Sequence, residues 1–272
     1  MRADLHSHTI YSDGSFTIPQ IINRAKERGM DILAITDHDT FNGAKIAYEM
    51  DPKMGLKVIY GMELSTERNG ESIHILCYFS KVQDDNNILV SALENQRKNR
   101  KTRAYEMGKL LKEHFNIDLD MSFVEERESI TRGTIGDELF KQGFVASKKE
   151  AFTKMIGSGC PAYIPSTKLS TEEGIKLIKE AGGLCVLAHP CLYKKNDIEE
   201  LIKLGVEGIE AVYPNNENSE TKYRDLARKY NLLVTGGSDF HMDNDYKHGN
   251  VGTSYIKDED LRRFLRVLEN EH

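Results

Sequence analysis

The stretch Ile32-Leu33-Ala34-Ile35-Thr36-Asp37-His38-Asp39 sets the pattern of the whole sequence. Its first half is a continuous run of apolar and β-branched residues, which is typical of a strand buried on both faces of a parallel sheet. Polar, ionisable side chains follow without a break. In parallel α/β folds, active sites are built at the carboxyl ends of such strands. The stretch therefore predicts a buried strand over 32–36 with functional side chains directly after it.

Strand and helix patterns alternate outward from this stretch. Thr17-Ile18-Pro19-Gln20 has the capping-box pattern and opens a helix that ends near Gly29, and Ser170-Thr171-Glu172-Glu173 caps a second helix that ends at Gly182-Gly183. We count about seven strands, most of them separated by helices: Arg2–Leu5, Ile32–Thr36, Lys57–Met62, Ile73–Phe79, Leu184–Ala188, Val206–Val212 and Leu232–Thr235. This rhythm predicts a parallel α/β architecture, and the placement of the polar residues favours a barrel over an open sheet.

Residues 84–166 break the rhythm. They begin with a long helical pattern, interrupted by the basic run Arg97–Arg103, and no strand of the barrel type follows. We interpret 84–166 as a mainly helical insert subdomain, with residues 1–83 and 167–272 forming the barrel domain. The basic run is either the solvated face of a helix or a surface that steers a nucleotide or short RNA toward the site.

The composition limits the classes of function. Hydrophobic residues make up 39% and charged residues 29% of the 272 residues, an ordinary globular balance, and the net charge of −6 gives no general attraction to nucleic acid or anionic membranes. No apolar run approaches the roughly 20 residues that cross a bilayer. The N-terminus lacks the regions of a signal peptide, and the four cysteines have no CxxC spacing. We therefore expect a cytoplasmic protein without disulfides.

Histidines and carboxylates gather at the expected strand ends. Six of the nine histidines lie in short polar signatures: His6-Ser7-His8, Thr36-Asp37-His38-Asp39, Ser72-Ile73-His74, Ala188-His189-Pro190 and Ser238-Asp239-Phe240-His241. Asp13 follows the first signature, and Glu63 stands alone in Gly61-Met62-Glu63. His74 is the exception, because it lies near the start of its strand, and that strand could run in an irregular sense.

Imidazole and carboxylate together are suitable ligands for Zn, Mn or Fe ions. A carboxylate such as Glu63 or Asp239 can bridge two ions about 3.5–4 Å apart, and such ions activate water and neutralise charge on a phosphoryl group. A single buried histidine is more often a hydrogen-bonded core residue than a ligand. For the whole set, metal binding is the better interpretation, because the crowded polar groups would otherwise be uncompensated.

In their order along the chain, these signatures resemble the motifs of the PHP (polymerase and histidinol phosphatase) superfamily of phosphoesterases. The matching motifs are Asp4-Leu5-His6-Ser7-His8-Thr9 with Ser12-Asp13-Gly14, Ile35-Thr36-Asp37-His38-Asp39, Gly61-Met62-Glu63, His74, Leu187-Ala188-His189-Pro190 and Gly237-Ser238-Asp239-Phe240-His241. The resemblance spans nearly the whole chain. It implies a distorted (β/α)7 barrel with a trinuclear centre, so two to three divalent metal ions (Mn, Fe or Zn) are expected.

The family pattern also implies which residues hold each ion. The first ion is held by His6, His8, Glu63 and Asp239. The second is held by Glu63, His74 and His189, with Glu63 as the bridge. The third is held by Asp13, His38 and His241.

Within that superfamily, the chain most resembles the group that has a helical insert after the fourth strand. This group includes bacterial 3′,5′-nucleoside bisphosphate phosphatases and a related 5′→3′ RNA exonuclease, which carry an arginine motif at the edge of the insert. Here the motif reads Ile130-Thr131-Arg132-Gly133-Thr134, with Thr134 where a histidine is common. Arg132 is therefore a candidate clamp for a second phosphate, and a solvated surface arginine is the alternative.

Further residues have candidate roles beside the metal ligands. His248 follows the last ligand closely and could protonate the leaving group. Asp4, Asp37 and Asp39 are interpreted as acceptors that orient ligand imidazoles, with simple turn capping as the alternative.

These observations predict a metal-dependent phosphatase that uses a metal-activated hydroxide on a small phosphorylated substrate. The best guess is a 3′,5′-nucleoside bisphosphate such as adenosine 3′,5′-bisphosphate (pAp). The alternatives are a non-nucleotide substrate such as histidinol phosphate, 5′→3′ exonuclease action on short RNA, and a non-catalytic metal-binding module, whose sign would be lost ligands. We expect no obligate protein partner and no membrane association.

Overall fold

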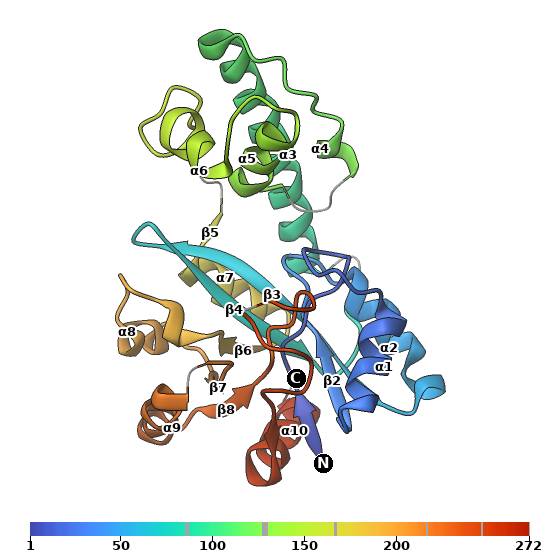
Figure 1. Ribbon diagram of the computed structural model, residues 1–272. Helices are drawn as coiled ribbons and strands as arrows, with labels where there is room; N and C mark the ends of the chain where they lie inside the picture. Colours follow the sequence, from blue (N-terminus) through green and yellow to red (C-terminus); the bar gives the residue numbers. More distant parts are fainter. Residues whose placement is uncertain (85–86, 127–129, 166–167, 216, 246, 272) are drawn as a thin grey trace. The chain divides into compact units, whose positions relative to one another are not determined.

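The chain forms two compact units, seen here in a computed structural model that describes residues 1–84, 87–126, 130–165, 168–215, 217–245 and 247–271. One unit comprises Met1–Val90 and Leu169–His272, and we call it the sheet unit. The other comprises Ser91–Lys168, and we call it the helical unit. Figure 1 shows the strands of the first and the helices α3 to α6 of the second.

One mixed sheet dominates the sheet unit. Its strands follow the order β8-β7-β6-β4-β3-β2-β1-β9, and the short β5 pairs with β3. The strands are β1 (Arg2–Asp4), β2 (Ile32–Ile35), β3 (Lys57–Arg68), β4 (Glu71–Phe79), β5 (Leu169–Ser170), β6 (Leu184–Leu187), β7 (Gly208–Val212), β8 (Leu233–Gly236) and β9 (Ile256–Lys257). The seven predicted strands are all present within this sheet, and β5 and β9 are additions that the sequence analysis did not contain.

β4, the strand of His74 for which the sequence left an irregular sense open, is the exception to the expected parallel arrangement. β1, β2 and β3 run parallel, as do β6, β7 and β8, but β4 is antiparallel to both of its neighbours, β3 and β6. The reversal is made by a tight hairpin in which Arg68 pairs with Glu71. Its two central residues, Asn69 and Gly70, have φ values of 51° and 68°. Asn-Gly is the strongest sequence signal for such a turn.

The sheet is nearly closed into a barrel. The segment after β1 joins the segment after β8 through bonds from the amide of Leu5 to the carbonyl of Gly236 (3.1 Å) and from the amide of His8 to the carbonyl of Phe240 (2.9 Å). Because these bonds join the end strand β8 to β1, the last strand but one on the opposite side of the order, the loops after β1 and β8 lie side by side. The predicted fold class, a barrel-like α/β domain with a helical insertion, is confirmed.

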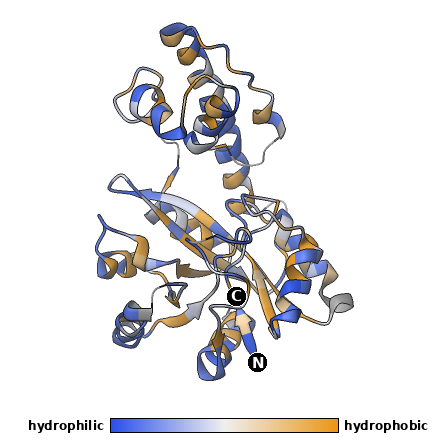
Figure 2. Ribbon diagram, viewed as in Figure 1, coloured by the Kyte–Doolittle hydropathy of each residue, from blue (hydrophilic) through white to orange (hydrophobic). Residues whose placement is uncertain are grey.

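Helices flank the strands of the sheet unit, and two of them begin at the predicted caps, Thr17 and Ser170. The helices are α1 (Ile18–Glu27), α2 (Asn42–Met54), α7 (Thr171–Glu180), the short 3₁₀ helix η2 (Pro190–Leu192), α8 (Ile198–Lys203), α9 (Glu217–Tyr230) and α10 (Asp258–Glu271). Both predicted capping boxes form: Gln20 accepts from the Thr17 amide (2.9 Å), and Ser170 and Glu173 accept from each other's amides (3.2 and 3.1 Å). In Figure 2 the strands are mainly hydrophobic, and the helices carry hydrophilic residues.

The helical unit has a core of its own. It contains most of α3 (Ile88–Phe115), then α4 (Phe123–Glu126), α5 (Arg132–Lys141), α6 (Lys148–Ala151) and the π-helical turn η1 (Phe152–Ile156). Buried side chains from these elements pack together, among them Met107, Leu111, Ile135 and Leu139. In the described part of the chain, no helix combines the length and apolar character that a membrane span requires.

Candidate metal centre

The sheet unit brings all nine predicted metal ligands into one region. His6, His8 and Asp13 follow β1, and His38 follows β2. Glu63 lies within β3, while His189 follows β6, and Asp239 and His241 follow β8. His74 lies near the start of β4, and because β4 is antiparallel, that start lies beside the far half of β3, where His74 pairs with Ser65.

The first group within this region is fully buried and contains His6, His8, Glu63 and Asp239. Nε2 of His6 lies 3.4 Å from Oε2 of Glu63 and 3.2 Å from Oδ1 of Asp239. Nε2 of His8 lies 3.3 Å and 3.1 Å from the same two oxygens. Two imidazoles and two carboxylates therefore surround one point.

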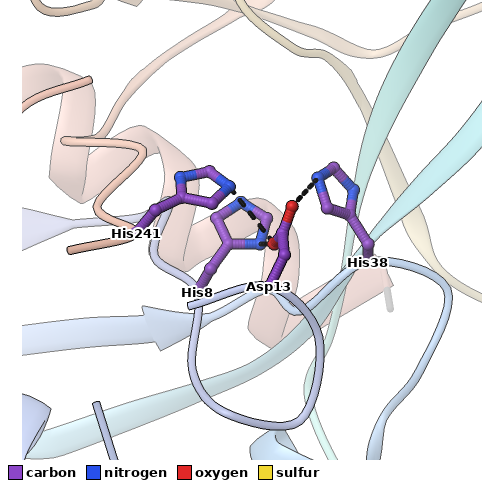
Figure 3. A group of neighbouring side chains, drawn as sticks. All are labelled: His8, Asp13, His38 and His241. Carbon is purple, nitrogen blue, oxygen red and sulfur yellow. Dashed lines mark ion pairs between the residues drawn. The ribbon is translucent and has the colours of Figure 1, made fainter. Parts of the chain in front are cut away.

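A second group is formed around Asp13, which His8, His38 and His241 face (Figure 3). Asp13 Oδ1 lies 3.3 Å from Nε2 of His241 and 3.7 Å from Nδ1 of His8. Asp13 Oδ2 lies 3.8 Å from Nε2 of His38. His8 thus presents one ring nitrogen to each of the two groups.

Glu63 occupies the middle of the region. Its Oε1 lies 2.9 Å from Nδ1 of His74 and 2.9 Å from Nε2 of His189, while its Oε2 lies 3.0 Å from Nδ1 of His38. Backbone bonds fix this position, because the Asp39 amide donates to the Glu63 carbonyl (3.0 Å) and the Glu63 amide to the Asp37 carbonyl (3.3 Å). With one oxygen toward each side, the carboxylate has the placement that a bridge between two ions requires.

The backbone is strained where it presents these groups. Asp39, His189 and Asp239 have φ values of 55°, 23° and 51°, in the left-handed region that non-glycine residues rarely adopt. Each of them follows a strand, at the point where the chain turns away from the sheet. Such strain persists only where the surrounding structure enforces it, and it concentrates at functional sites.

The donor atoms fit divalent cations better than they fit one another. Oε2 of Glu63, Oδ1 of Asp239 and Nδ1 of His38 are buried and make no hydrogen bond to any part of the described chain. Nδ1 of His6 lies 3.0 Å from a carboxylate oxygen of Glu210, and a proton there leaves the Nε2 lone pair of His6 directed at the first group. Buried acceptors crowded in this way are costly unless cations lie between them.

The pKa values of these groups reflect their mutual charges in the metal-free chain. Burial raises the pKa of Glu63, but the facing His38, His74 and His6 outweigh burial and hold it well below its usual range. Burial lowers the pKa of His8, but the facing carboxylates of Asp239 and Glu63 outweigh burial and raise it to about 10. For His38, burial dominates and lowers the pKa to about 4.

Metal binding should therefore release protons. Because the pKa of His8 is raised to about 10, its ring is protonated at pH 8 in chain prepared metal-free by chelation, and a cation must displace that proton. Metal affinity should rise with pH between about 7 and 10, and about one proton or more should be released per chain at pH 8. Calorimetric titration with Mn²⁺ in buffers of different ionisation enthalpy measures this release, and an observed enthalpy independent of the buffer would contradict it.

Two residues that the sequence analysis missed hold this centre in place. Glu210 is fully buried in β7, where it accepts from the backbone amide of His189 (2.8 Å) as well as facing the ring of His6. Tyr213 donates its hydroxyl to Oδ2 of Asp239 (2.8 Å). A glutamate inside the apolar strand Gly208–Val212 was the available signal, because a buried carboxylate needs a partner.

The carboxylates of Asp4 and Asp37 have a different role from the predicted one. Asp4 accepts from the backbone amides of Ser238 (2.9 Å) and Gly252 (2.8 Å), and Asp37 accepts from the amide and hydroxyl of Thr9 (2.7 Å each). Neither carboxylate bonds to an imidazole of the described residues, so the prediction that they orient imidazoles is wrong. Both instead join segments that are far apart in the sequence, which the turn-capping alternative does not describe either. Asp39 accepts from the amide of Ser65 (2.8 Å).

His248 lies next to the centre, as its proximity in sequence suggested. Its ring stacks on that of His241 with centroids 4.3 Å apart, and its Nε2 lies 3.8 Å from Oδ2 of Asp239. Nδ1 of His248 lies 2.7 Å from a carboxylate oxygen of Asp245. The carboxylate fixes the ring and leaves Nε2 on the side of the metal ligands.

Arg132 lies in the helical unit, at the first residue of α5. Its guanidinium stands over the rings of Tyr163 and Phe152, 5.1 Å and 6.0 Å from their centroids, and it is half-buried rather than fully solvated. Thr134, at the position where a histidine is common, accepts from the amide of Thr131 (3.2 Å) and completes the cap of α5.

The basic run does not form a uniformly solvated face. Arg100 and Arg103 are buried, whereas Lys98 is exposed and Lys101 pairs with Glu125 (2.7 Å). Because two of its guanidinium groups are buried, the interpretation of the basic run as the solvated face of a helix is wrong for Arg100 and Arg103.

Comparison with known proteins places these features in a family. The family model of the PHP domain matches residues 4–158. The chain is 31% identical to the 3′,5′-nucleoside bisphosphate phosphatase of Chromobacterium violaceum, over 98% of this chain and 95% of that protein. It is 31% identical to the 5′-3′ exoribonuclease Rnm of Escherichia coli, over 88% of this chain and 85% of that protein.

Two further proteins are similar to this chain over most of its length. The phosphoribosyl 1,2-cyclic phosphate 1,2-diphosphodiesterase of Eggerthella lenta is 28% identical, over 89% of this chain and 94% of that protein. The solved structure of an amidohydrolase from Chromobacterium violaceum superimposes with a TM-score of 0.77 at 28% identity, over 98% of this chain and 97% of that one. The likeness therefore extends over sheet and insert alike.

Proposed function

Because this chain belongs to the PHP family of metal-dependent phosphoesterases, we propose that it is a phosphatase that removes a phosphate from a 3′,5′-nucleoside bisphosphate such as pAp. The observation that carries the proposal is the convergence of all nine donors around Glu63, which argues against a non-catalytic module that has lost ligands. The full-length likeness to a nucleoside bisphosphate phosphatase supports this substrate class.

The proposed ligand sets follow the groups of donors. His6, His8, Glu63 and Asp239 would hold one divalent ion, Glu63, His74 and His189 a second, and Asp13, His38 and His241 a third. When bound, ions of this kind activate a water molecule and neutralise the charge on a phosphoryl group. The protein residues fix the ligand geometry, and Glu210 and Tyr213 hold His6 and Asp239 in it.

His248 is proposed to donate a proton to the leaving oxygen. Asp245 accepts from Nδ1 of the ring, so a proton on Nε2 would be directed toward the centre. Replacing His248 by Asn should lower kcat for pAp by about tenfold to a hundredfold. An aryl phosphate, whose leaving group needs no proton, should be hydrolysed at nearly the rate of the parent protein. Equal losses on both substrates would contradict the role.

Substrate choice is tested with Mn²⁺-loaded protein and a panel of phosphate esters: pAp, AMP, histidinol phosphate, an aryl phosphate and a 5′-phosphorylated short RNA. We expect kcat/KM for pAp to exceed that for AMP by about a hundredfold, roughly 2.7 kcal/mol, because a second phosphate adds binding in the transition state. Equal values for pAp and AMP would contradict a second-phosphate pocket.

Arg132 is proposed to bind that second phosphate. Arg132→Gln should remove most of the preference for pAp over AMP while leaving AMP hydrolysis unchanged, since a guanidinium binds phosphate through two parallel bonds. Lys141→Gln, at the exposed far end of the same helix, is the matched control. A preference that survives in Arg132→Gln would show that another group binds the second phosphate.

A second candidate function is 5′→3′ exonuclease action on short RNA. The likeness to the exoribonuclease Rnm over 88% of this chain supports it. One protein can catalyse this reaction and nucleotide hydrolysis, because both are hydrolyses of a phosphate ester. Release of mononucleotides from the 5′-phosphorylated RNA in the same panel identifies it, and phosphate release from histidinol phosphate alone would replace both proposals.

A further inference from the structure

The two histidines of the second proposed ligand set lie on separate segments of the chain. His74 lies in β4, close to the hairpin that joins β4 to β3, whereas His189 follows β6. Both rings face the same oxygen, Oε1 of Glu63, at 2.9 Å from each. The spacing of the two rings therefore depends on the contacts that hold these segments together.

Tyr193 contacts both of these histidines. Its hydroxyl accepts from the backbone amide of His74 (3.0 Å) and donates to the carbonyl of the same residue (3.3 Å). Its ring lies at 62° to the ring of His189, with centroids 5.8 Å apart. One side chain therefore holds His74 in position relative to His189.

The place of Tyr193 follows from where β6 ends. In a regular antiparallel ladder, two opposite residues exchange both of their backbone hydrogen bonds. The amide of Ala188 donates to the carbonyl of His74 (3.1 Å), but β6 ends at Leu187 and the chain turns away at His189, where φ is 23°. The amide of His74 donates to the Tyr193 hydroxyl instead. Tyr193 thus continues the pairing of β4 beyond the end of β6.

Glu71 joins the hairpin to the segment that begins with Tyr193. Its carboxylate accepts from three successive backbone amides, those of Lys194 (2.7 Å), Lys195 (3.0 Å) and Asn196 (3.1 Å). Successive amides that point at one spot form a concave site for an anion, which here is a side chain of the protein itself. Burial raises the pKa of Glu71, but these amides outweigh burial and lower it, so the carboxylate is charged at neutral pH.

Asn196 completes the connection. It is 7% exposed, and its NH₂ group donates to Oε2 of Glu71 (3.0 Å) and to the carbonyl of Arg68 (3.0 Å). Its oxygen accepts from the side chain of Asn69 (2.9 Å). In Figure 1 the hairpin between β3 and β4 lies beside the segment that leads to α8. We call the bonds of Glu71 and Asn196 between this hairpin and residues 193–196 the hairpin contact.

We infer that Tyr193, Glu71 and Asn196 are positioning residues for one metal ion. They set the spacing of His74 and His189 and so determine how tightly the second ligand set binds its metal. None of the three belongs to the donors grouped around Glu63. The inference rests on the ligand sets of the proposed function, and it deepens them by making the affinity of one ion depend on a contact outside the centre.

The other two ions should not depend on this contact. Within the described chain, no bond of Tyr193, Glu71 or Asn196 reaches Asp13 or Asp239, the carboxylates that serve the other two sets. A loss confined to one ion is therefore the signature of the positioning role. A general loss of structure would weaken all of them.

The test measures metal binding rather than product. The full-length chain, stripped of metal by chelation, is titrated with Mn²⁺ by calorimetry, and low-temperature EPR then reads the spin coupling between Mn²⁺ ions that share Glu63. Tyr193→Phe removes only the hydroxyl. Tyr105→Phe is the matched control, because its hydroxyl donates to Glu125 (2.9 Å) at an exposed position in the helical unit.

Tyr193→Phe should raise the Kd of one Mn²⁺ by about tenfold to a hundredfold, the range typical of residues that orient a metal ligand. The Kd values of the other Mn²⁺ ions should change less than about twofold. At a Mn²⁺ concentration that just saturates the parent chain, the coupled EPR signal should weaken. Tyr105→Phe should match the parent in every respect.

Glu71→Gln tests the hairpin contact separately. It should weaken the same ion, because a neutral amide replaces the charged partner of three backbone amides. Glu67→Gln, an exposed glutamate on the same hairpin, is its control. Glu71→Gln decides the matter if Tyr193→Phe does not fold.

Two double variants identify the ion that is affected. In a His74→Asn background, the second ligand set is already broken, so adding Tyr193→Phe should cause no further change in Mn²⁺ binding. In a His241→Asn background, only the third set is broken. Adding Tyr193→Phe there should have its full effect.

Three results would overturn the inference. They are equal Kd values in the parent, Tyr193→Phe and Glu71→Gln, an equal weakening of every Mn²⁺, and a Tyr193→Phe effect that persists in the His74→Asn background. Mn²⁺ binding without hydrolysis of pAp would contradict the proposed reaction alone, because the test reads metal binding. A parent chain that binds no Mn²⁺ would contradict the metal centre and this inference with it.

Discussion

Replacing Glu63 by Gln should lower kcat/KM for phosphoester hydrolysis by at least about a thousandfold, roughly 4 kcal/mol of transition-state stabilisation. The carboxylate faces five imidazoles, those of His6, His8, His38, His74 and His189, and it presents one oxygen to each side. A neutral amide has a single oxygen and cannot bridge two ions. Its NH₂ group would also meet ring nitrogens that are placed for a negative partner.

The same substitution should reduce metal content as well as rate. Elemental analysis after reloading with Mn²⁺ should show the loss of at least one ion per chain relative to the parent protein. The metal-free variant should also unfold at a lower Tm, because removing one member of a buried charge cluster typically costs about 3–5 kcal/mol.

Glu67→Gln provides the control for Glu63→Gln. Glu67 lies on the same strand, β3, but it is exposed. Its replacement by Gln removes the same single negative charge. Its activity and metal content should match those of the parent. Full metal occupancy and a near-parental rate in Glu63→Gln would exclude the bridging role.

Replacing Glu210 by Gln should weaken metal binding by about tenfold to a hundredfold although Glu210 is not itself a proposed ligand. The carboxylate serves two donors at once, the ring of His6 through Oε1 and the backbone amide of His189 through Oε2. A glutamine has one oxygen, so either the His6 ring or the His189 amide would face an NH₂ group. His6 or His189 would then lose its orientation.

The measurement for Glu210→Gln is the Kd for Mn²⁺, obtained by calorimetry, together with the rate at rising Mn²⁺. Excess metal should restore much of the activity, which separates a positioning role from a direct one. Glu200→Gln, an exposed carboxylate in α8, is the control. An unchanged Kd in Glu210→Gln would show that His6 and His189 are oriented without it.

Local features of the chain were predictable because their causes are local. Two helices begin after Thr17 and Ser170, because side chains there satisfy free backbone amides within one turn. The donors after β1, β2, β6 and β8 follow from the rule that strand ends of parallel units share one face. The Asn69-Gly70 turn is equally local, and it is the signal in the sequence that β4 reverses direction, which the position of His74 had only left open.

The amino-acid sequence by itself determined the strands, their caps and the set of histidines and carboxylates, since these depend on neighbours along the chain. Only the tertiary structure decided which of these side chains meet. The antiparallel β4 brings His74 to Glu63, and β7 places Glu210 between His6 and His189. The contact between His6 and Glu210 joins residues 204 positions apart, and the others join residues that lie on or directly after different strands. They depend on the closure of the sheet, which no short stretch of sequence encodes.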